Sequence, residues 1–304
     1  MNEVYDSIIV GAGPAGLSAS IYLARKKLNF IILTEELGGQ IAKSGSVENY
    51  PGFSQISGQK LIDRIVEQAK SNGVSITYEQ LKSIAPEGDN FLVETDKNKY
   101  VTKSAIISGG KTPIKLNVSG EEKLTGKGVA YCATCDAPLF KDKKVAVIGA
   151  GNSALDTVLQ LSKYTKDILL ISNCEKLKCD LIMEQKIKEF GFVKIIYNAE
   201  TLAIKGENLV SGVILRDIKT GDEKEISVDG VFITIGWQPS TDFEMPCKKN
   251  DKNEIIVDKN CQTSIPGIFA AGDITDILAK QSIVATGEGA KAALGVYKHL
   301  NENQ

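Results

Sequence analysis

The chain has 304 residues, which at roughly 150 residues per domain predicts about two domains. Its 36 Lys and Arg residues nearly balance its 38 Asp and Glu residues, and a net charge of -2 argues against a nucleic-acid partner. The one histidine, His299, lies close to the C-terminus, which disfavours both a Ser-His-Asp hydrolase and a histidine-ligated metal site.

The first long apolar stretch has no charged residue from Ser7 to Ala24, which is long enough for a membrane span. The segment Gly11–Gly16 interrupts it with three glycines and a proline, and acidic Glu3 and Asp6 precede it where a signal peptide has basic residues. We therefore interpret the stretch as part of a globular domain and expect a cytoplasmic protein.

A strand, a glycine turn, a helix and a second strand follow one another from Asp6 to Thr34. The turn has the pattern G-x-G-x-x-G, in which the glycines permit a tight turn, close approach of a pyrophosphate and close packing of helix on strand. The positive end of the helix then faces the phosphates. The residues expected to contact a dinucleotide here are Gly11, Gly13, Pro14, Ala15 and Gly16.

An acidic residue ends the second strand, where a carboxylate can accept hydrogen bonds from ribose hydroxyls. Glu35 has the expected distance from the turn, but its neighbour Glu36 competes for the same role. The sequence leaves open which of the two contacts a ribose.

The middle of the chain predicts a strand over Lys99–Ile107 that enters Gly109–Gly110. Linkers are expected at Thr112–Pro113 and at Trp237–Ser240, since proline and polar residues there separate the periodic segments. The C-terminal part predicts a helix over residues 279–299.

The sharpest chemical signal is the C-x-x-C-D motif formed by Cys132, Cys135 and Asp136. Two cysteines three positions apart can close a disulfide and reopen it by thiol exchange. Asp136 is the natural proton carrier for that exchange, because no histidine lies nearby. The alternatives are half a zinc site and a structural disulfide. The remaining cysteines lack the spacing of a second ligand pair, so we expect no metal.

A second glycine turn begins at Gly149, after the apolar run 144–148, and has Ala154 in the third glycine position. Two such turns predict two dinucleotides, the economical pair being a flavin and a nicotinamide nucleotide. The residues expected at the second one are Gly149, Gly151, Asn152, Ser153, Ala154 and Ser172. Ser172 ends the next strand, where neither an acidic residue nor an arginine indicates NADH or NADPH.

Together these motifs resemble the low-molecular-weight thioredoxin reductases, and are similar also to the flavoprotein part of alkyl hydroperoxide reductase. Further matching segments are 38–40, 48–52, 267–273, 280–281 and 289–290. The resemblance implies an α/β protein with two Rossmann-like, three-layer ββα dinucleotide-binding domains. A discontinuous FAD domain would comprise residues 1–112 and 241–304, and a nicotinamide-type domain carrying the cysteine pair would comprise residues 113–240.

The resemblance also extends the FAD site beyond the first glycine turn. It implies that Gly272 and Asp273 hold the ribityl and phosphate part, and that residues 281–283 approach the isoalloxazine ring. The residues it adds are Gly39, Gln40, Asn49, Gly110, Gly272, Asp273, Lys280, Gln281, Ser282 and Ile283.

By position in the family, Cys135 faces the flavin, Cys132 attacks the disulfide of a partner protein and Asp136 moves the proton. The implied protein is a homodimer with hinges near Pro113 and near Gln238–Pro239, and its partner is a thioredoxin-like or glutaredoxin-like protein. The expected activity is a thioredoxin-disulfide reductase.

The electron donor and the exact function stay open at this point. The donor is NADH, NADPH or, as in relatives without a nicotinamide, ferredoxin or a deazaflavin. The chain can instead belong to a peroxiredoxin system that works through a glutaredoxin-like carrier, or be a non-catalytic flavin redox sensor. The family's His-Arg-Arg motif for NADPH is replaced here by Ser172–Cys174.

Overall fold

The computed structural model describes residues 3–42, 47 and 49–302, with the side chain of Cys135 outside the description. Contacts divide the chain into two compact units, residues 1–112 with 238–304 and residues 113–237. We call them unit 1 and unit 2. The second boundary thus follows Trp237, whereas the sequence places it after Ser240.

Unit 1 is built around a parallel sheet in the order β19-β8-β2-β3-β4. Its strands are β2 (Ser7–Ala12), β3 (Phe30–Leu37), β4 (Ile76–Tyr78), β8 (Ala105–Ile107) and β19 (Ile268–Ala270). A second sheet has the order β1-β7-β6-β5 and comprises β1 (Val4–Tyr5), β5 (Leu81–Glu87), β6 (Asn90–Thr95) and β7 (Lys99–Thr102). The helices are α1 (Pro14–Arg25), α2 (Gly39–Ala42), α3 (Gly58–Ser71) and α8 (Ser282–Glu302).

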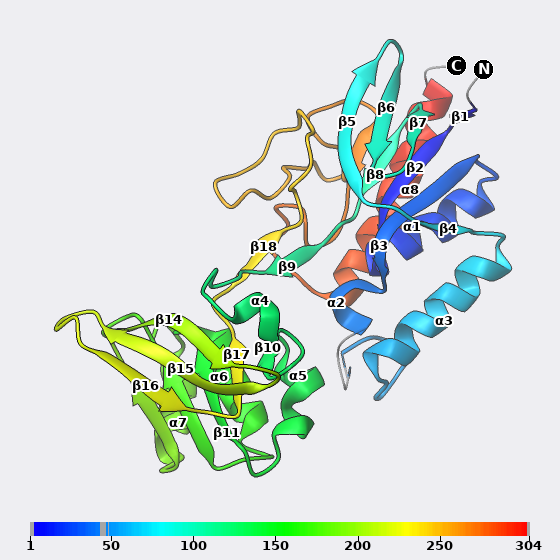
Figure 1. Ribbon diagram of the computed structural model, residues 1–304. Coiled ribbons are helices and arrows are strands. Elements are labelled where there is room, and N and C mark those ends of the chain that lie inside the picture. The colour runs from blue at the N-terminus through cyan, green and yellow to red at the C-terminus, as the bar shows by residue number, and fades with distance from the viewer. Residues whose placement is uncertain (1–2, 43–46, 48, 303–304) are drawn as a thin grey trace. The chain divides into compact units, whose positions relative to one another are not determined.

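The alternation of side chains along β2 explains the layers of unit 1. Ile9 points into a core shared with α1, α3 and α8, whereas Ile8 and Val10 point into a core shared with β5 and β6. Figure 1 shows the helices on one side of the parallel sheet and the second sheet on the other. This helix, sheet and sheet arrangement confirms the predicted three-layer α/β class.

The strand predicted over Lys99–Ile107 is wrong as a single strand, because the chain changes sheets in its middle. β7 pairs with β1, and β8 pairs with β2. The change occurs at Ser104, which is fully buried and donates its hydroxyl to the Asp6 carbonyl at 2.7 Å. The side chains of Thr102 and Ser104 brace the change with hydrogen bonds to backbone carbonyls, beside the backbone hydrogen bonds that Lys103 and Ser104 make to the neighbouring segment.

Unit 2 contains a parallel sheet in the order β10-β17-β11-β12-β13. Its strands are β10 (Val129–Ala130), β11 (Lys144–Ile148), β12 (Asp167–Ile171), β13 (Val193–Ile196) and β17 (Gly230–Ile233). The antiparallel strands β14 (Ala199–Gly206), β15 (Val210–Asp217) and β16 (Glu223–Ser227) form a separate sheet. The helices are α4 (Glu121–Leu124), α5 (Ala133–Asp136), the 3-10 helix η1 (Ala137–Phe140), α6 (Asn152–Leu161) and α7 (Leu181–Glu189).

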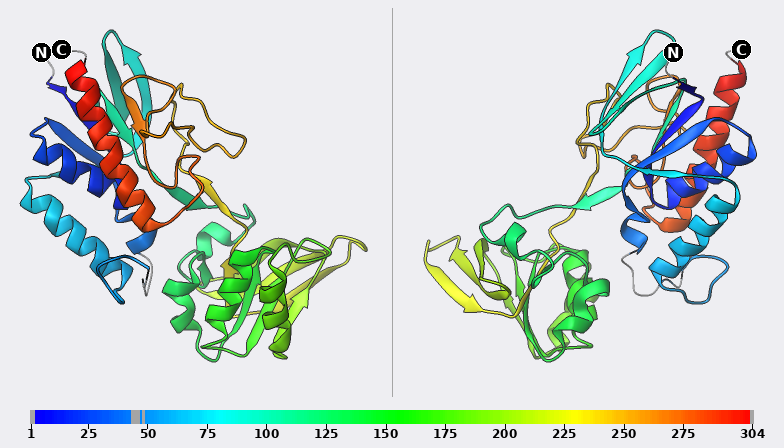
Figure 2. Two further views of the ribbon diagram at one scale, coloured as in Figure 1. Left: turned by 180° about the vertical axis from the view of Figure 1, so that it is seen from behind. Right: turned by 45° about the vertical axis from the view of Figure 1, so that its right-hand side comes forward.

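The core of unit 2 repeats the arrangement of unit 1. One cluster joins the parallel sheet to α6 and α7, and the other joins it to β14 and β15. Figure 2 shows the helices and the antiparallel sheet on opposite faces of the parallel sheet. The linkers that connect the two units are β9 (Lys111–Pro113) and β18 (Trp237–Pro239), which pair as a two-stranded sheet.

None of the helices formed by the described residues has the length and apolar character that a bilayer crossing requires.

The packing of α8 on α1 depends on a glycine. A Cβ atom at Gly289 would lie 1.9 Å from the carbonyl oxygen of Ala15, whereas one at Gly287, on the same helix, would meet nothing within 4 Å. We therefore expect Gly289→Ala to lower the stability of unit 1 by about 1–3 kcal/mol, the usual cost of overpacking. Gly287→Ala is the matched control, with a gain of up to about 1 kcal/mol from helix propensity.

Urea unfolding followed by circular dichroism measures both variants. Equal midpoints for Gly289→Ala and Gly287→Ala would show that α8 does not need its close approach to α1.

Candidate functional site

A cavity of about 370 Å³ lies in unit 1 at the carboxyl ends of the parallel strands. We call it the glycine-turn cavity, because the first glycine turn forms one of its walls. In open α/β sheets, ligands bind at this edge. Among the residues predicted for FAD, those lining the cavity are Gly11, Gly13, Pro14, Ala15, Glu35, Gly39, Gln40, Gly110, Gly272, Asp273, Lys280, Gln281 and Ser282.

The glycines of the first turn have two separate uses. A Cβ at Gly16 would lie 1.8 Å from the Gly11 carbonyl oxygen, so this glycine lets α1 pack on β2. A Cβ at Gly13 would meet nothing within 4 Å and would instead fill the cavity. Gly13 also caps α1, and Pro14 begins it, so bare backbone and the positive helix end face the cavity together. This cradle fits the pyrophosphate of a dinucleotide.

Three of the predicted FAD residues do not line the cavity. Gly16 lies behind the turn, as its packing requires. Asn49 donates its amide to the Gln281 side chain at 3.1 Å and so reaches the cavity through a neighbour. Ile283 is 38% exposed on the first turn of α8. Glu35 and Glu36 both line the cavity, so the competition between them stays open.

Lys111 and Ser108 also belong to this site, although the sequence analysis did not single them out. Ser108 donates to the Val10 and Gly11 carbonyl oxygens at 2.8 and 3.0 Å and thereby ties the end of β8 to the turn. Lys111 lines the cavity and pairs with the buried Glu254 at 2.9 Å. Their position in the sequence could have identified them, because both come shortly after β8 ends, at the sheet edge where parallel sheets bind ligands.

The predicted redox motif lies at the start of α5 in unit 2. Cys132 is the N-cap of this helix, and the Asp136 amide donates to its carbonyl oxygen at 3.2 Å. Burial raises the pKa of Asp136 above its ordinary value. A carboxyl group with a raised pKa keeps its proton closer to neutral pH and is therefore better suited to proton transfer. The Cys135 side chain lies outside the described residues.

Helix α5 is held by a chain of side chains from α6. The Thr134 hydroxyl donates to Gln160 at 2.7 Å, and the Gln160 amide donates to Asp156 at 2.6 Å. Asp156 therefore has a structural use at the end of this chain of side chains. The described residues contain no group of three or more His, Cys, Asp or Glu side chains placed to hold a metal ion.

The second glycine turn is engaged by the chain itself. Gly149 adopts φ +154°, and a Cβ there would lie 2.5 Å from the Thr234 carbonyl oxygen. The Lys178 amide donates to the Ala150 carbonyl at 2.7 Å. The Asn152 side chain both donates to the Asp180 carboxylate and accepts from the Asp180 amide. Segment 178–180 therefore lies along the second glycine turn as a strap, held to it by these hydrogen bonds.

The remaining residues predicted for the nicotinamide differ in exposure. Ser153 is exposed, Gly151 pairs with Lys178 in a bridge, and Ala154 is buried in the core. Ser172 has no exposed surface, and its hydroxyl both accepts from and donates to the Cys174 backbone. The Ser172 hydroxyl, predicted to contact the second dinucleotide, is thus already hydrogen-bonded within the protein.

Comparison with known proteins agrees with this geometry. Residues 5–292 match the family described as pyridine nucleotide-disulphide oxidoreductase. The chain is 38% identical to thioredoxin reductase of Ureaplasma parvum, with 99% of this chain and 98% of that protein covered. It is also 38% identical to an alkyl hydroperoxide reductase component of Escherichia coli, covering 98% of this chain but only 58% of that longer protein.

Among solved structures, thioredoxin reductase of Lactococcus lactis in its FR conformation matches with a TM-score of 0.83 and 33% identity, covering 98% of this chain and 99% of that one. These findings confirm the resemblance that the motifs indicate and the predicted fold class.

A buried carboxylate supports the segment that carries the redox motif. Glu121 is 2% exposed and accepts from the Tyr131 hydroxyl at 2.7 Å and from the Asn117 amide at 2.6 Å. Burial and this carboxylate raise the pKa of Tyr131. We expect Tyr131→Phe to cost about 1–3 kcal/mol, because it removes a donor from a buried charge.

Tyr164→Phe is the matched control, since Tyr164 is 37% exposed in the same unit. Urea unfolding at neutral pH measures both substitutions, and an equal loss in the two variants contradicts the expectation.

Proposed function

Because the chain belongs to the pyridine nucleotide-disulphide oxidoreductase family, we propose that it is an FAD-dependent thioredoxin-disulfide reductase. The observation that carries the proposal is the pairing of two features in one chain. Unit 1 has a glycine-turn cavity suited to a dinucleotide, and unit 2 has a C-x-x-C-D motif at the start of a short helix. We propose residues 1–112 with 238–304 as the FAD domain and residues 113–237 as the nicotinamide-type domain.

FAD, when bound, supplies the group that takes electrons from a donor and passes them to the cysteine pair. The protein's own residues hold it in the glycine-turn cavity. Gly11 and Gly13 offer bare backbone, the positive end of α1 would face the phosphates, and a carboxylate at the end of β3 would accept from the ribose. Gln281 and Ser282, at the start of α8, line the cavity and would lie beside the isoalloxazine ring, with Ile283 next to them in the chain.

The reduced cysteine pair then exchanges with a disulfide of the partner protein. The Cys132 thiolate attacks one partner sulfur, and a mixed disulfide forms while the other partner sulfur leaves as a thiolate. Asp136 donates a proton to that thiolate, for which its raised pKa suits it. Attack by Cys135 on Cys132 releases the second partner thiol and restores the Cys132–Cys135 disulfide.

The partner that we propose is a thioredoxin-like protein, and the working form is a homodimer in the cytoplasm. A glutaredoxin-like carrier of a peroxiredoxin system is the second candidate. It is favoured by the similarity to the alkyl hydroperoxide reductase component, whose remaining length this chain does not match.

The Cys132→Ser variant tests the exchange role. We expect it to lose thioredoxin reduction by more than about 100-fold, the scale of removing an essential catalytic group, while the donor still reduces the flavin. Cys174→Ser is the control, because Cys174 is a partly buried cysteine of the same unit outside the motif. If Cys132→Ser still reduces thioredoxin, another thiol must carry out the exchange.

Anaerobic mixing of the FAD-loaded protein with NADH or NADPH identifies the donor through bleaching of the flavin band. We expect no advantage for NADPH, since none of the chain's three arginines, Arg25, Arg64 and Arg216, falls in the sequence stretch after β12, where an arginine that binds a 2′-phosphate is expected. Markedly faster bleaching by NADPH would mean that lysines such as Lys176 and Lys178 bind it. Bleaching by dithionite alone would point to ferredoxin or a deazaflavin.

A further inference from the structure

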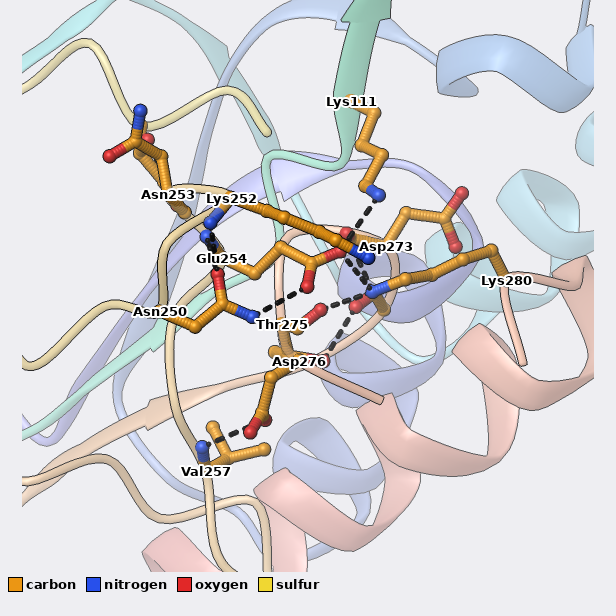
Figure 3. A network of polar contacts seen from close by, with 12 residues as sticks. Lys111, Asn250, Lys252, Asn253, Glu254, Val257, Asp273, Thr275, Asp276 and Lys280 are labelled. Atoms are coloured by element: carbon orange, nitrogen blue, oxygen red, sulfur yellow. Dashed lines mark hydrogen bonds and ion pairs between the residues drawn. The ribbon is translucent and has the colours of Figure 1, made fainter. Parts of the chain in front are cut away.

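A buried carboxylate lies behind the glycine-turn cavity and holds two of the cations in its wall. Glu254 Oε1 is 2.9 Å from Lys111 Nζ and 3.1 Å from Lys280 Nζ, and its Oε2 accepts from Asn250 at 2.8 Å (Figure 3). These contacts join β9, the segment before α8 and the loop 250–254. We call Lys111, Glu254 and Lys280 the charge triad.

The loop that carries Glu254 is itself well ordered by hydrogen bonds. The Asn250 amide and the Glu254 carbonyl oxygen are joined at 2.9 Å, and the Asn250 side chain accepts from the Lys252 and Glu254 amides. Ile255, which follows, is fully buried and hydrogen-bonded to Ile274. The position of the carboxylate is therefore fixed by the backbone on both sides.

The members of the charge triad differ in how many partners hold them. Lys280 Nζ also donates to the backbone carbonyl oxygens of Asp273, at 3.3 Å, and of Thr275. For Lys111, the contact that the structure gives its ammonium group is with Glu254. Glu254 thus fixes the orientation of Lys111 more strongly than that of Lys280.

The triad is buried enough for its charges to act on the cavity. Its side chains are 9% exposed for Glu254, 18% for Lys111 and 24% for Lys280. The hydrogen bonds from Asn250 and both lysines outweigh burial and lower the pKa of Glu254 to about 2. Glu254 therefore keeps its negative charge at physiological pH, opposite the two lysine ammonium groups.

The two cations and the anion lie at different depths. Lys111 and Lys280 line the cavity together with Asp273, whereas Glu254 is not among the lining residues. A ligand in the cavity would touch the ammonium groups directly and would feel the carboxylate only through them. In a site of low dielectric, such a charge behind the wall still acts strongly.

We propose that Glu254 is a positioning residue that sets the reduction potential of FAD by holding Lys111 and by offsetting part of the positive charge at the cavity wall. This inference rests on the proposed function, because it requires that the cavity hold a flavin. It deepens that function by assigning the electrostatic control of the flavin to residues outside the glycine turn and the cysteine motif.

The sign of the effect follows from the charge of the cofactor. A flavin gains negative charge when it is reduced near neutral pH, so nearby cations favour the reduced form and nearby anions disfavour it. Removing the Glu254 charge leaves two cations at the wall and should raise the potential. Removing the Lys111 charge leaves a neutral Lys280–Glu254 pair and should lower it.

The test measures the two-electron midpoint potential of the bound flavin, at neutral pH, by equilibration with a dye of known potential. We expect Glu254→Gln to shift the equilibrium about tenfold toward the reduced flavin, which for a two-electron couple is about 30 mV. Lys111→Met should shift it about as far in the opposite direction. The double variant has the wild-type net charge and should return toward the wild-type potential.

Glu94→Gln is the matched control, because Glu94 pairs with Lys99 on the surface of the same unit, away from the cavity lining. Its potential should equal that of the wild type. If Glu254→Gln does not fold, Lys111→Met alone tests the inference. A lowered flavin potential in that variant supports it, and an unchanged or raised potential overturns it.

The outcomes separate this inference from the proposed function. FAD-bound variants whose potentials all coincide with those of wild type and Glu94→Gln overturn the inference and leave the reductase function standing. A purified wild-type chain that binds no FAD overturns both. Opposite shifts in Glu254→Gln and Lys111→Met support the inference, whatever protein proves to be the disulfide partner.

Discussion

The close approach of bare backbone around the first glycine turn is the constraint on which unit 1 depends. A side chain at Gly11 would collide with the Ser108 carbonyl oxygen, and one at Gly289 would collide with that of Ala15. These approaches bring β2, β8 and α8 together at one sheet edge, although the three segments are far apart in the sequence. The glycine-turn cavity exists because these segments meet without side chains between them.

Short sequence patterns predicted the elements whose formation depends on residues close together in the chain. The short apolar run that ends at Val10 and the glycine spacing after it both predicted correct elements, since a strand and a turn are properties of a short segment. The division of Lys99–Ile107 into two strands was missed because it depends on hydrogen bonds to the distant Asp6. Glu254 likewise has no local signal, since its partner Lys111 is 143 positions away.

The two glycine turns share a motif but differ in their surroundings. At the first turn, Gly13 faces the open cavity, whereas at the second turn Asn152 and Asp180 hold a strap of chain against the helix start. The buried Ser172 hydroxyl adds to this difference. A glycine motif therefore describes the backbone path, and the segments that come later in the chain decide how much of it a ligand can reach.

Lys111 has a second property that follows from where it stands in the chain. It is the first residue of β9, the strand through which the chain leaves unit 1, and the first boundary between the units comes directly after Thr112. The ammonium group that pairs with Glu254 is therefore attached to one of the two strands, β9 and β18, that link the units. Because Lys111 belongs to both the linker and the cavity wall, a change in the path of β9 at this residue would also move a positive charge in the wall of the glycine-turn cavity.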